Sequence, residues 1–447
     1  MKHTRVLAVC TLVLLLGSCA GAENWPQWRG PNLNGSSNET GLPASFSKTE
    51  NMAWVCPMPG RSGGTPIIWE DSVFVSSADA KTKDLLALCL NRRDGSIRWK
   101  KVVASGVDRA YGRNSNMCSP SPMTDGKTVW FYYGTGNLAA FDFGGNQLWA
   151  RNLEKDHGTF AIMWGYGSSA LLYKDRLYVP VMQCNKQVYA AGPGKGSPRD
   201  SFLLALDPKT GKDLWKAKRP SDAVTESQES YATPVPYEGP GRMEILLFGA
   251  DYMSGHNPEN GEEYWRCGGC NPARMGDLRV VPSPVAADGF IFVCSPKHRN
   301  PFFAVKAGGT GNITQTHVAW KLAKEFSPDV CTPLVYKDML YVLDGSADKR
   351  HVLCLDPKTG AQKWAGQVPG KATYWASLTA ADGKLYCINE AAEVSVLSAG
   401  DEFKLLATVP LGDSVCYSSI AISQKQLFIR TGQNLYCVGK VEGGEKP

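Results

Sequence analysis

Ten residues of types that bind ligands or move protons stand a few positions before a Ser or Thr that recurs along the chain. Carboxylate and amide oxygens are ligands that calcium prefers, and a carboxylate can also act as a general base. An arginine can hold ligand oxygens, and a flat aromatic ring can support a ligand. We expect these side chains to gather on one face of a central channel as a binding site: Arg61, Asn116, Trp164, Glu229, Tyr231, Arg279, Asp329, Tyr374, Trp375 and Tyr417.

Two cysteines, Cys267 and Cys270, are separated by only two glycines. A zinc site would need a second pair at a matching distance, and the chain has none. The spacing therefore favours a local disulfide between Cys267 and Cys270, or two plain thiols. Other cysteines, such as Cys89 and Cys437, stand in apolar strand-like runs, where cysteine behaves as a small buried hydrophobe.

The elements that position these residues are predicted by a repeated phrase. The segment 206–215 reads Leu-Asp-Pro-Lys-Thr-Gly-Lys-Asp-Leu-Trp, and 355–364 repeats its first six residues and its final Trp. Asp can cap a turn through its side chain, Pro presets φ, and Gly takes the positive φ that a bulged hairpin needs. Apolar residues alternate beside the turn with period two, which indicates strands. We expect each repeated Trp to pack against the neighbouring sheet.

Two independent landmarks each occur eight times. The first is a Trp, or once a Leu, in the return strand, at Trp54, Trp99, Trp149, Trp215, Trp265, Trp320, Trp364 and Leu406. The second is a hydroxyl residue that opens each unit, at Thr65, Ser121, Ser169, Thr233, Ser283, Thr332, Ser377 and Ser419. Radial repetition of four-stranded sheets gives a propeller.

The two ends of the repeat region complement each other. The last unit stops after the strand around Tyr436, whereas Trp54 stands in a strand with no unit ahead of it. We therefore predict an all-β fold, one eight-bladed β-propeller of four-stranded antiparallel blades over residues 51–440, closed by an N-terminal strand. Residues 23–50 are expected to be an extended N-terminal segment, and 441–447 a C-terminal tail. The 447 residues, 43% hydrophobic and 20% charged, suit one such folded body.

Residues 1–22 have the order of a secretory signal peptide, with Lys2 and Arg5, an apolar run over 6–16 and then small residues. Two processing sites stay open. Cleavage after 20–22 would leave Glu23 first, whereas 16–19 resembles a bacterial lipobox that would acylate Cys19, and we favour the lipobox. We expect an exported protein of the periplasm or outer membrane that reaches the membrane only through a lipid anchor.

The charge pattern argues against nucleic acid as a partner. The formal net charge is +6, and it falls to +4 when the leader with Lys2 and Arg5 is removed. Basic residues are spread among acidic ones along the chain rather than gathered on one face, as a nucleic-acid reader would need.

The segment 205–215 matches throughout the pattern Ala-x-Asp-x-x-Thr-Gly-x-x-x-Trp, and Cys354 replaces the Ala in the other good copy. This pattern resembles the repeats of pyrroloquinoline quinone (PQQ) proteins over roughly residues 50–440. Such repeats occur in quinoprotein alcohol dehydrogenases, whose eight blades hold the quinone and calcium. They also occur in BamB-type lipoproteins, which assist barrel insertion at the outer membrane and carry no quinone. The segment 24–31 further looks like the mature start of a group of exported bacterial PQQ-repeat proteins.

The resemblance leaves two functions open. The ten channel residues include every type that quinone chemistry needs, but the adjacent Cys-Cys pair of many quinoprotein alcohol dehydrogenases is absent, and Asn271 follows Cys270 where a haem-attachment motif has His. We therefore expect a monomeric, non-catalytic binding or scaffold protein of the BamB-like kind, with no catalytic residue, metal or cofactor and with an envelope protein or peptide as partner. The alternative is a dehydrogenase that depends on PQQ and calcium.

Overall fold

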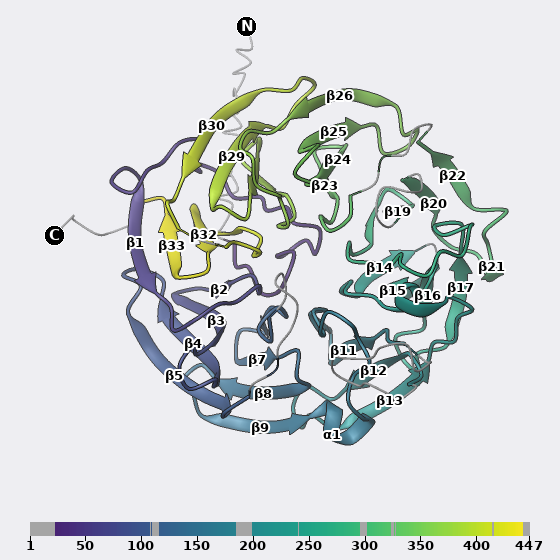
Figure 1. Cartoon of the computed structure of the whole chain (residues 1–447), viewed down its shortest axis with the longest axis horizontal. Coiled ribbons are helices and arrows are strands. Elements are labelled where there is room, and N and C mark those ends of the chain that lie inside the picture. Colours follow the sequence, from purple (N-terminus) through teal and green to yellow (C-terminus); the bar gives the residue numbers. More distant parts are fainter. Residues whose placement is uncertain are drawn as a thin grey trace, which may run out of the picture.

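The strands of this chain form eight sheets arranged around one axis (Figure 1). The computed structural model describes residues 23–107, 109, 116–184, 199–239, 241–295, 302–322, 326, 328–413 and 415–440. The leader expected over 1–22, with Cys19, and the tail expected over 441–447 lie outside these residues. No helix in the described ranges is long and apolar enough to cross a membrane.

The first four blades follow one another along the chain, each running from an inner to an outer strand. Blade 1 contains β2 (Ile67–Trp69), β3 (Ser72–Ala78), β4 (Leu85–Asn91) and β5 (Ile97–Ala104). Blade 2 contains β6 (Met123–Thr124), β7 (Thr128–Tyr132), β8 (Asn137–Asp142) and β9 (Gln147–Asn152). Blade 3 contains β10 (Leu171–Tyr173), β11 (Arg176–Val181), β12 (Phe202–Leu206) and β13 (Asp213–Lys218). Blade 4 contains β14 (Val235–Gly239), β15 (Arg242–Gly249), β16 (Tyr252–His256) and β17 (Glu263–Cys267).

The remaining blades repeat this order with one addition. Blade 5 contains β18 (Val285–Ala287), β19 (Phe290–Val293), β20 (Phe303–Lys306) and β22 (Val318–Lys321), while β21 (Gly311–Asn312) pairs in parallel with β17 of blade 4. Blade 6 contains β23 (Leu334–Tyr336), β24 (Met339–Asp344), β25 (His351–Leu355) and β26 (Gln362–Gln367). Blade 7 contains β27 (Thr379–Ala381), β28 (Lys384–Ile388), β29 (Glu393–Ser398) and β30 (Leu405–Pro410). Blade 8 contains β31 (Ala421–Ser423), β32 (Gln426–Arg430), β33 (Asn434–Val438) and β1 (Met52–Pro57).

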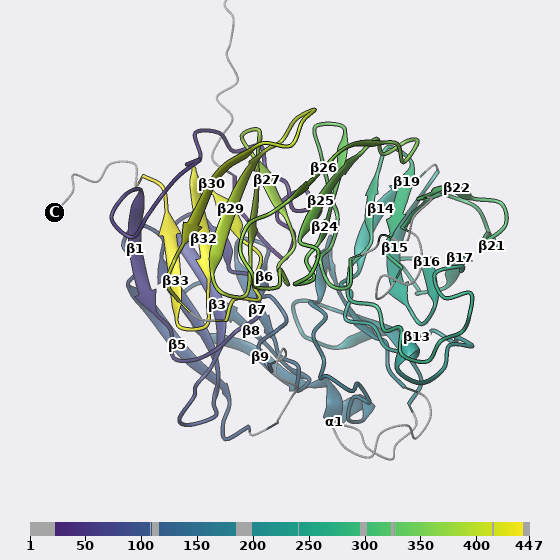
Figure 2. The same ribbon diagram turned by 45° about the horizontal axis from the view of Figure 1, so that its top comes forward.

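Blade 8 closes the ring with strands from both ends of the chain. β1 pairs antiparallel with β33, so that Trp54 lies opposite Cys437 and Val55 opposite Tyr436. In both ribbon views the purple β1 lies beside the yellow β33 (Figures 1 and 2). The eight-bladed all-β fold and its closure by the N-terminal strand are confirmed.

The repeated phrase forms the predicted bulged hairpin. The backbone N–H of Gly211 donates to the carbonyl oxygen of Asp207 at 2.8 Å, and the Asp207 carboxylate accepts from the N–H of Lys209 at 2.7 Å. Gly211 has φ +70°, and the register between β12 and β13 shifts at Leu206. The turn chemistry therefore sets where β12 ends and where β13 begins.

The recurring Trp and Gly residues of the repeat join neighbouring blades. The Trp149 indole of blade 2 lies on Gly211 of blade 3, where an added Cβ would come within 2.6 Å of the ring. Its Nε1–H donates to the carbonyl oxygen of Pro208 in the same turn at 2.9 Å. Trp54 makes the equivalent contacts with blade 1, at Gly95 and at the carbonyl of Arg92. The expected packing role of these Trp residues is confirmed for this pair of interfaces.

Two short helices interrupt the strands. α1 (Leu153–His157) follows β9, and its N-terminal N–H of Lys155 donates to the Asn152 side chain at 2.9 Å. The 3-10 helix η1 (Thr225–Gln228) stands between blades 3 and 4 and carries Glu226 toward the channel face.

The N-terminal segment before β1 crosses one face of the ring. It bonds to innermost strands three residues after the hydroxyl landmark in several blades, for example where Trp25 pairs with Ile68, the Gln27 side chain with Leu172, and Gly35 with Ala380. Figure 1 shows this purple segment passing over the centre of the ring. One end of the channel is therefore covered by chain from outside the blades.

Candidate functional site

The hydroxyl landmarks form a continuous ring around the channel. The backbone N–H of each landmark residue donates to the hydroxyl oxygen of the next blade's landmark, beginning with Thr65 to Ser121 and ending with Ser377 to Ser419, at 2.8–3.1 Å. At the remaining junction the Ser418 hydroxyl donates to the carbonyl of Gly64 at 3.1 Å. The recurring hydroxyl therefore has a structural role, because it ties each inner strand to its neighbour.

A second tier of residues lies above this ring, two positions before each landmark. Together with Trp164 and Arg279 these eight residues line a cavity of about 360 Å³: Gly63, Ser119, Gly167, Tyr231, Val281, Val330, Trp375 and Tyr417. Blades 1, 2 and 3 contribute Gly, Ser and Gly, whereas the other blades contribute larger side chains. The cavity is therefore asymmetric, with open space beside blades 1–3 and aromatic walls from blades 4, 7 and 8.

Below the cavity, a second pocket of about 140 Å³ is lined by all eight hydroxyl residues and by Trp28. Arg29 beside it is 3% exposed and donates to the carbonyl oxygens of Leu378 at 2.7 Å and Pro333 at 2.9 Å. Burial lowers the pKa of the Arg29 guanidinium to about 9. The N-terminal segment therefore contributes Trp28 to the channel lining next to the hydroxyl ring.

Three of the aromatic rings at the cavity donate a hydrogen bond to a carboxylate. Trp164 Nε1–H donates to Glu226 Oε1 at 2.9 Å, and the Trp375 indole N–H donates to Glu390. The Tyr231 hydroxyl donates to Glu229 Oε2 at 3.1 Å. Burial and the nearby Glu229 charge raise the pKa of Tyr231 well above its ordinary value, so the phenol keeps its proton. Each carboxylate thus lies at the polar edge of a ring whose carbon body lines the cavity.

Arg279 is the one charged side chain among the cavity-lining residues, and its nitrogens face carboxylates. Its Nη1 and Nη2 bond to the two oxygens of Asp329 at 2.9 and 3.1 Å, and its Nε lies 3.5 Å from Glu226 Oε1. Burial lowers the pKa of Arg279, but the charges of Asp329 and Glu226 raise it further, and the pKa lies above its ordinary value. The guanidinium is therefore held in a bidentate pair within the wall.

Only half of the ten predicted residues line the cavity, namely Trp164, Tyr231, Arg279, Trp375 and Tyr417. Glu229 and Asp329 lie behind it and bond to lining residues. Arg61 and Asn116 line a separate open depression of about 740 Å³ between the ends of blades 8, 1 and 2. Tyr374 is 1% exposed and packs in the core of blades 6 and 7, with its hydroxyl donating to the Pro369 carbonyl at 2.8 Å.

A calcium site made by Glu229, Asn116 and Asp329 would need their oxygens to converge. Instead, Glu229 accepts from the N–H of Met163 at 3.1 Å, and Asn116 Oδ1 accepts from the N–H of Cys118 at 2.8 Å within its own turn. Asp329 is paired with Arg279. Within the described part of the chain, no group of three His, Cys, Asp or Glu side chains is placed to hold a metal ion. In the structure the side chains of Glu229, Asn116 and Asp329 therefore bond to separate protein groups.

Cys267 and Cys270 are both free thiols in the structure, and both are buried. Cys270 Sγ donates to the carbonyl of Asp251 at 2.9 Å, while Cys267 packs in the core between blades 4 and 5. Burial raises the pKa of Cys267 to about 11. A disulfide between them stays a prediction.

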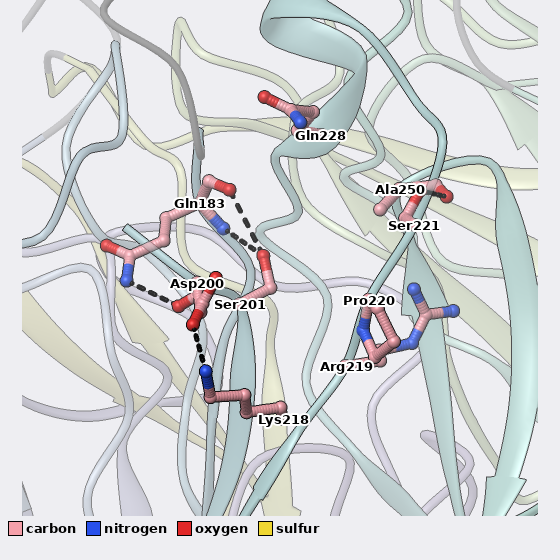
Figure 3. Close-up of a pocket in the computed structure, with 9 residues that line it drawn as sticks. All are labelled: Gln183, Asp200, Ser201, Lys218, Arg219, Pro220, Ser221, Gln228 and Ala250. Carbon is pink, nitrogen blue, oxygen red and sulfur yellow. Dashed lines mark hydrogen bonds and ion pairs between the residues drawn. The ribbon is translucent and has the colours of Figure 1, made fainter. Parts of the chain in front are cut away.

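A smaller pocket of about 100 Å³ lies between blades 3 and 4, away from the channel (Figure 3). Its polar groups largely bond to one another, as where Lys218 Nζ meets Asp200 at 2.6 Å and where the Gln183 amide donates to the Asp200 carbonyl at 2.9 Å. Arg219 at its wall donates to Ser254 and to the Tyr252 carbonyl of blade 4. Since one water occupies about 30 Å³ of liquid, this pocket has room for only a few waters.

Several cavity residues were missed from the sequence, including Gly63, Ser119, Gly167, Val281 and Val330. The usable signal was their position, because each of these residues stands two places before a hydroxyl landmark, in the segment that leads into an inner strand. Seven of the ten predicted residues instead stand three to five positions before a landmark, and they were chosen for their side-chain type. Trp28 carried no such signal, because it belongs to a segment outside the repeat.

Solved structures with this fold include both kinds of PQQ-repeat protein. BamB from Moraxella catarrhalis has a TM-score of 0.58 at 12% identity, covering 86% of this chain and 98% of that one. The quinohemoprotein alcohol dehydrogenase from Comamonas testosteroni has a TM-score of 0.64 at 11% identity, covering 95% and 82%. A europium-containing methanol dehydrogenase has a TM-score of 0.62 at 12% identity, covering 90% and 89%. At such identities the likeness shows the fold alone.

Sequence comparison identifies the family. Comparison with curated proteins gave no match. The family described as outer membrane protein assembly factor BamB matches residues 42–195 and 180–366, which is most of the propeller. This chain therefore belongs to that family of PQQ-repeat propellers, whose fold is shared by BamB and by quinoprotein dehydrogenases.

Proposed function

We propose that this protein is a non-catalytic binding protein of the cell envelope that holds a segment of another envelope protein at the open end of its channel. The observation that carries the proposal is the cavity itself, which is lined mainly by aromatic, small and aliphatic side chains and adjoins the pocket lined by Trp28. Such a concave, mostly apolar site with a few polar groups suits a bound ligand. The family's description as an outer membrane assembly factor supports a protein partner and an envelope location.

The proposal can be tested by site-specific photocrosslinking in cells. A photoreactive residue at Trp164, which is 44% exposed at the cavity, should capture one reproducible envelope protein. The matched control places the same residue at Leu214, which is 48% exposed on the outer strand of blade 3. Gly167→Leu should abolish the crosslinked product, because the leucine side chain would fill the cavity. The added Cβ atom itself can be accommodated, since its nearest neighbour would be the Tyr231 ring at 3.4 Å. Equal capture from both positions, or capture unaffected by Gly167→Leu, would contradict the proposal.

A dehydrogenase that depends on PQQ and calcium is the alternative function for this fold. The solved alcohol dehydrogenases give it support at the level of architecture. Against it, Glu229, Asn116 and Asp329 each bond to a different protein group. Mixing the protein with quinone and calcium, followed by alcohols and an artificial electron acceptor, should give no turnover. Turnover that is lost in Glu229→Gln would replace the binding proposal.

A further inference from the structure

The channel cavity combines aromatic walls with negative charge placed behind them. Trp164, Tyr231 and Trp375 each donate a hydrogen bond to a carboxylate, to Glu226, Glu229 and Glu390 respectively. A ring that donates its polar hydrogen to an anion gains electron density on its faces. The faces of such rings attract a cation, because the ring quadrupole is negative there.

The charges around the cavity favour the same sign of ligand. Four carboxylates, those of Glu226, Glu229, Asp329 and Glu390, bond to residues of the cavity wall, whereas Arg279 is the one basic residue that lines it. Arg279 directs its nitrogens at Asp329 and Glu226. Among these described side chains, four are acidic and one is basic. Arg61 lines the separate depression beyond blade 1.

We propose that the cavity binds an alkylammonium group, whose cation rests between the rings of Trp164, Tyr231, Trp375 and Tyr417. The small residues of blades 1–3 at this level, Gly63, Ser119 and Gly167, leave the space in which the group enters. The hydroxyl ring below supplies oxygens to the ammonium hydrogens or to a polar end of the ligand. This inference rests on the proposed binding role of the channel and names the chemistry that is recognised there.

A neutral ligand such as a sugar fits these residues less well. A sugar needs side-chain amides or carboxylates that face the ligand and bond to its hydroxyls. Here the carboxylates of Glu229 and Glu390 bond to the rings from behind, and the cavity surface itself presents ring carbons, Val281, Val330 and small residues. The arrangement places charge where it acts through the rings rather than by direct contact.

Two sources could carry the ammonium group, and paired probes distinguish them by calorimetry on the folded protein. Choline is compared with 3,3-dimethylbutan-1-ol, its uncharged carbon analogue. A capped tripeptide with one central lysine is compared with the same peptide in which that lysine is acetylated. We expect the charged member of at least one pair to bind at least tenfold more tightly than its neutral partner, and the pair that shows this identifies the source.

Variants locate the binding in the cavity. Trp375→Leu should weaken the charged probe at least fivefold, and Gly167→Leu should abolish its binding by filling the cavity. Glu390→Gln keeps a hydrogen-bond acceptor for the Trp375 indole while removing the charge, so it should weaken the charged probe about twofold to fivefold and leave the neutral probe unchanged. Leu214→Ala, on the outer strand of blade 3, is the matched control and should bind as the unaltered protein does. Thermal unfolding confirms that each variant is folded.

The outcomes separate this inference from the binding proposal on which it rests. Equal affinity for charged and neutral probes, or no binding of either charged probe, overturns the ammonium inference, whereas the crosslink from position 164 would still support a binding role. A charge preference that survives both Trp375→Leu and Gly167→Leu places the ammonium site elsewhere and also overturns the inference. Loss of the crosslink with retained ammonium binding removes the protein partner and leaves a small-molecule site.

Discussion

Tryptophans at the perimeter and tryptophans at the channel mouth have different surroundings in this propeller. At the perimeter, the Trp54 indole donates to a backbone carbonyl, lies on a turn glycine and is 8% exposed. At the mouth, Trp164 donates to a carboxylate and is 44% exposed. Trp265 also donates to a carboxylate, that of Glu244, but it is fully buried. The exposure of the ring therefore distinguishes a Trp that packs between blades from a Trp that is available to a ligand. The hydrogen-bond partner of the indole nitrogen distinguishes them less well.

The largest expected effect comes from truncating a perimeter ring. Trp54→Ala removes the side chain that joins blade 8 to blade 1, so we expect the free energy of unfolding to fall by about 3–5 kcal/mol, the usual cost of removing a buried Trp. Urea titration followed by circular dichroism measures this change. Trp164→Ala at the mouth should cost less than about 1 kcal/mol. Equal losses for the two variants would remove the distinction between perimeter and mouth.

A smaller effect is expected where a perimeter ring meets a glycine. Gly211→Ala puts a Cβ within 2.6 Å of the Trp149 ring at a position with φ +70°, and should cost about 1–3 kcal/mol. Gly241→Ala is the matched control, because Gly241 also has positive φ, +82°, but no atom lies within 4 Å of its added Cβ. The difference in unfolding free energy between the two variants isolates the contact from the backbone strain. Equal losses in the two variants would show that the turn conformation, and not the contact with the Trp149 ring, requires glycine at position 211.

Blade 4 also holds two buried titratable groups with opposite effects on stability. Burial and the Arg219 charge lower the pKa of His256 to about 4, so the unfolded chain binds a proton first and stability falls as pH drops from 6.5 toward 4. Burial raises the pKa of Asp251 to about 6, although the Asn271 hydrogen bond opposes the shift, so its effect on stability is lost as pH rises from 4 to 6. The two contributions should largely cancel in the unaltered protein.

Single substitutions should reveal each contribution in a pH series of denaturant titrations. Asp251→Asn leaves His256, and the unfolding free energy should then fall between pH 6.5 and 4 by at most about 3 kcal/mol. His256→Asn leaves Asp251, and the unfolding free energy should instead rise as pH drops from 6 to 4. The same slope in both variants would mean that other groups control this pH range.

The smallest effect is expected for an apolar perimeter residue that faces water. Leu214 stands next to Trp215 in β13 and is 48% exposed. Leu214→Lys should change the free energy of unfolding by no more than about 0.5 kcal/mol. A larger loss would show that side chains on the outside of the ring also join neighbouring blades.

The sequence predicted the ring far better than it predicted the cavity. The blade count, the turn at Asp207 and the closure by Trp54 follow from residues that recur along the chain. These residues recur because every blade needs the same hairpin turn and the same packing against its neighbour. Residues in the cavity differ from blade to blade. Blades 1–3 place the small residues Gly63, Ser119 and Gly167 at the level where blade 7 places Trp375. Side-chain type alone misplaced Tyr374, which packs in the core, and Asn116, which caps its own turn. Contacts such as that of Arg279 with Asp329 join separate blades and have no local pattern.

The crossing of the N-terminal segment has a consequence for how this protein is made. Trp25 and Gln27 emerge first during synthesis, but Gly35 pairs with Ala380 and β1 pairs with β33, which are among the last parts to emerge. Pairings of such long sequence separation form slowly, because a large loop must close first. β1 must therefore wait unpaired for nearly the whole chain, and a protein truncated before blade 8 would leave β1 without its partner strand.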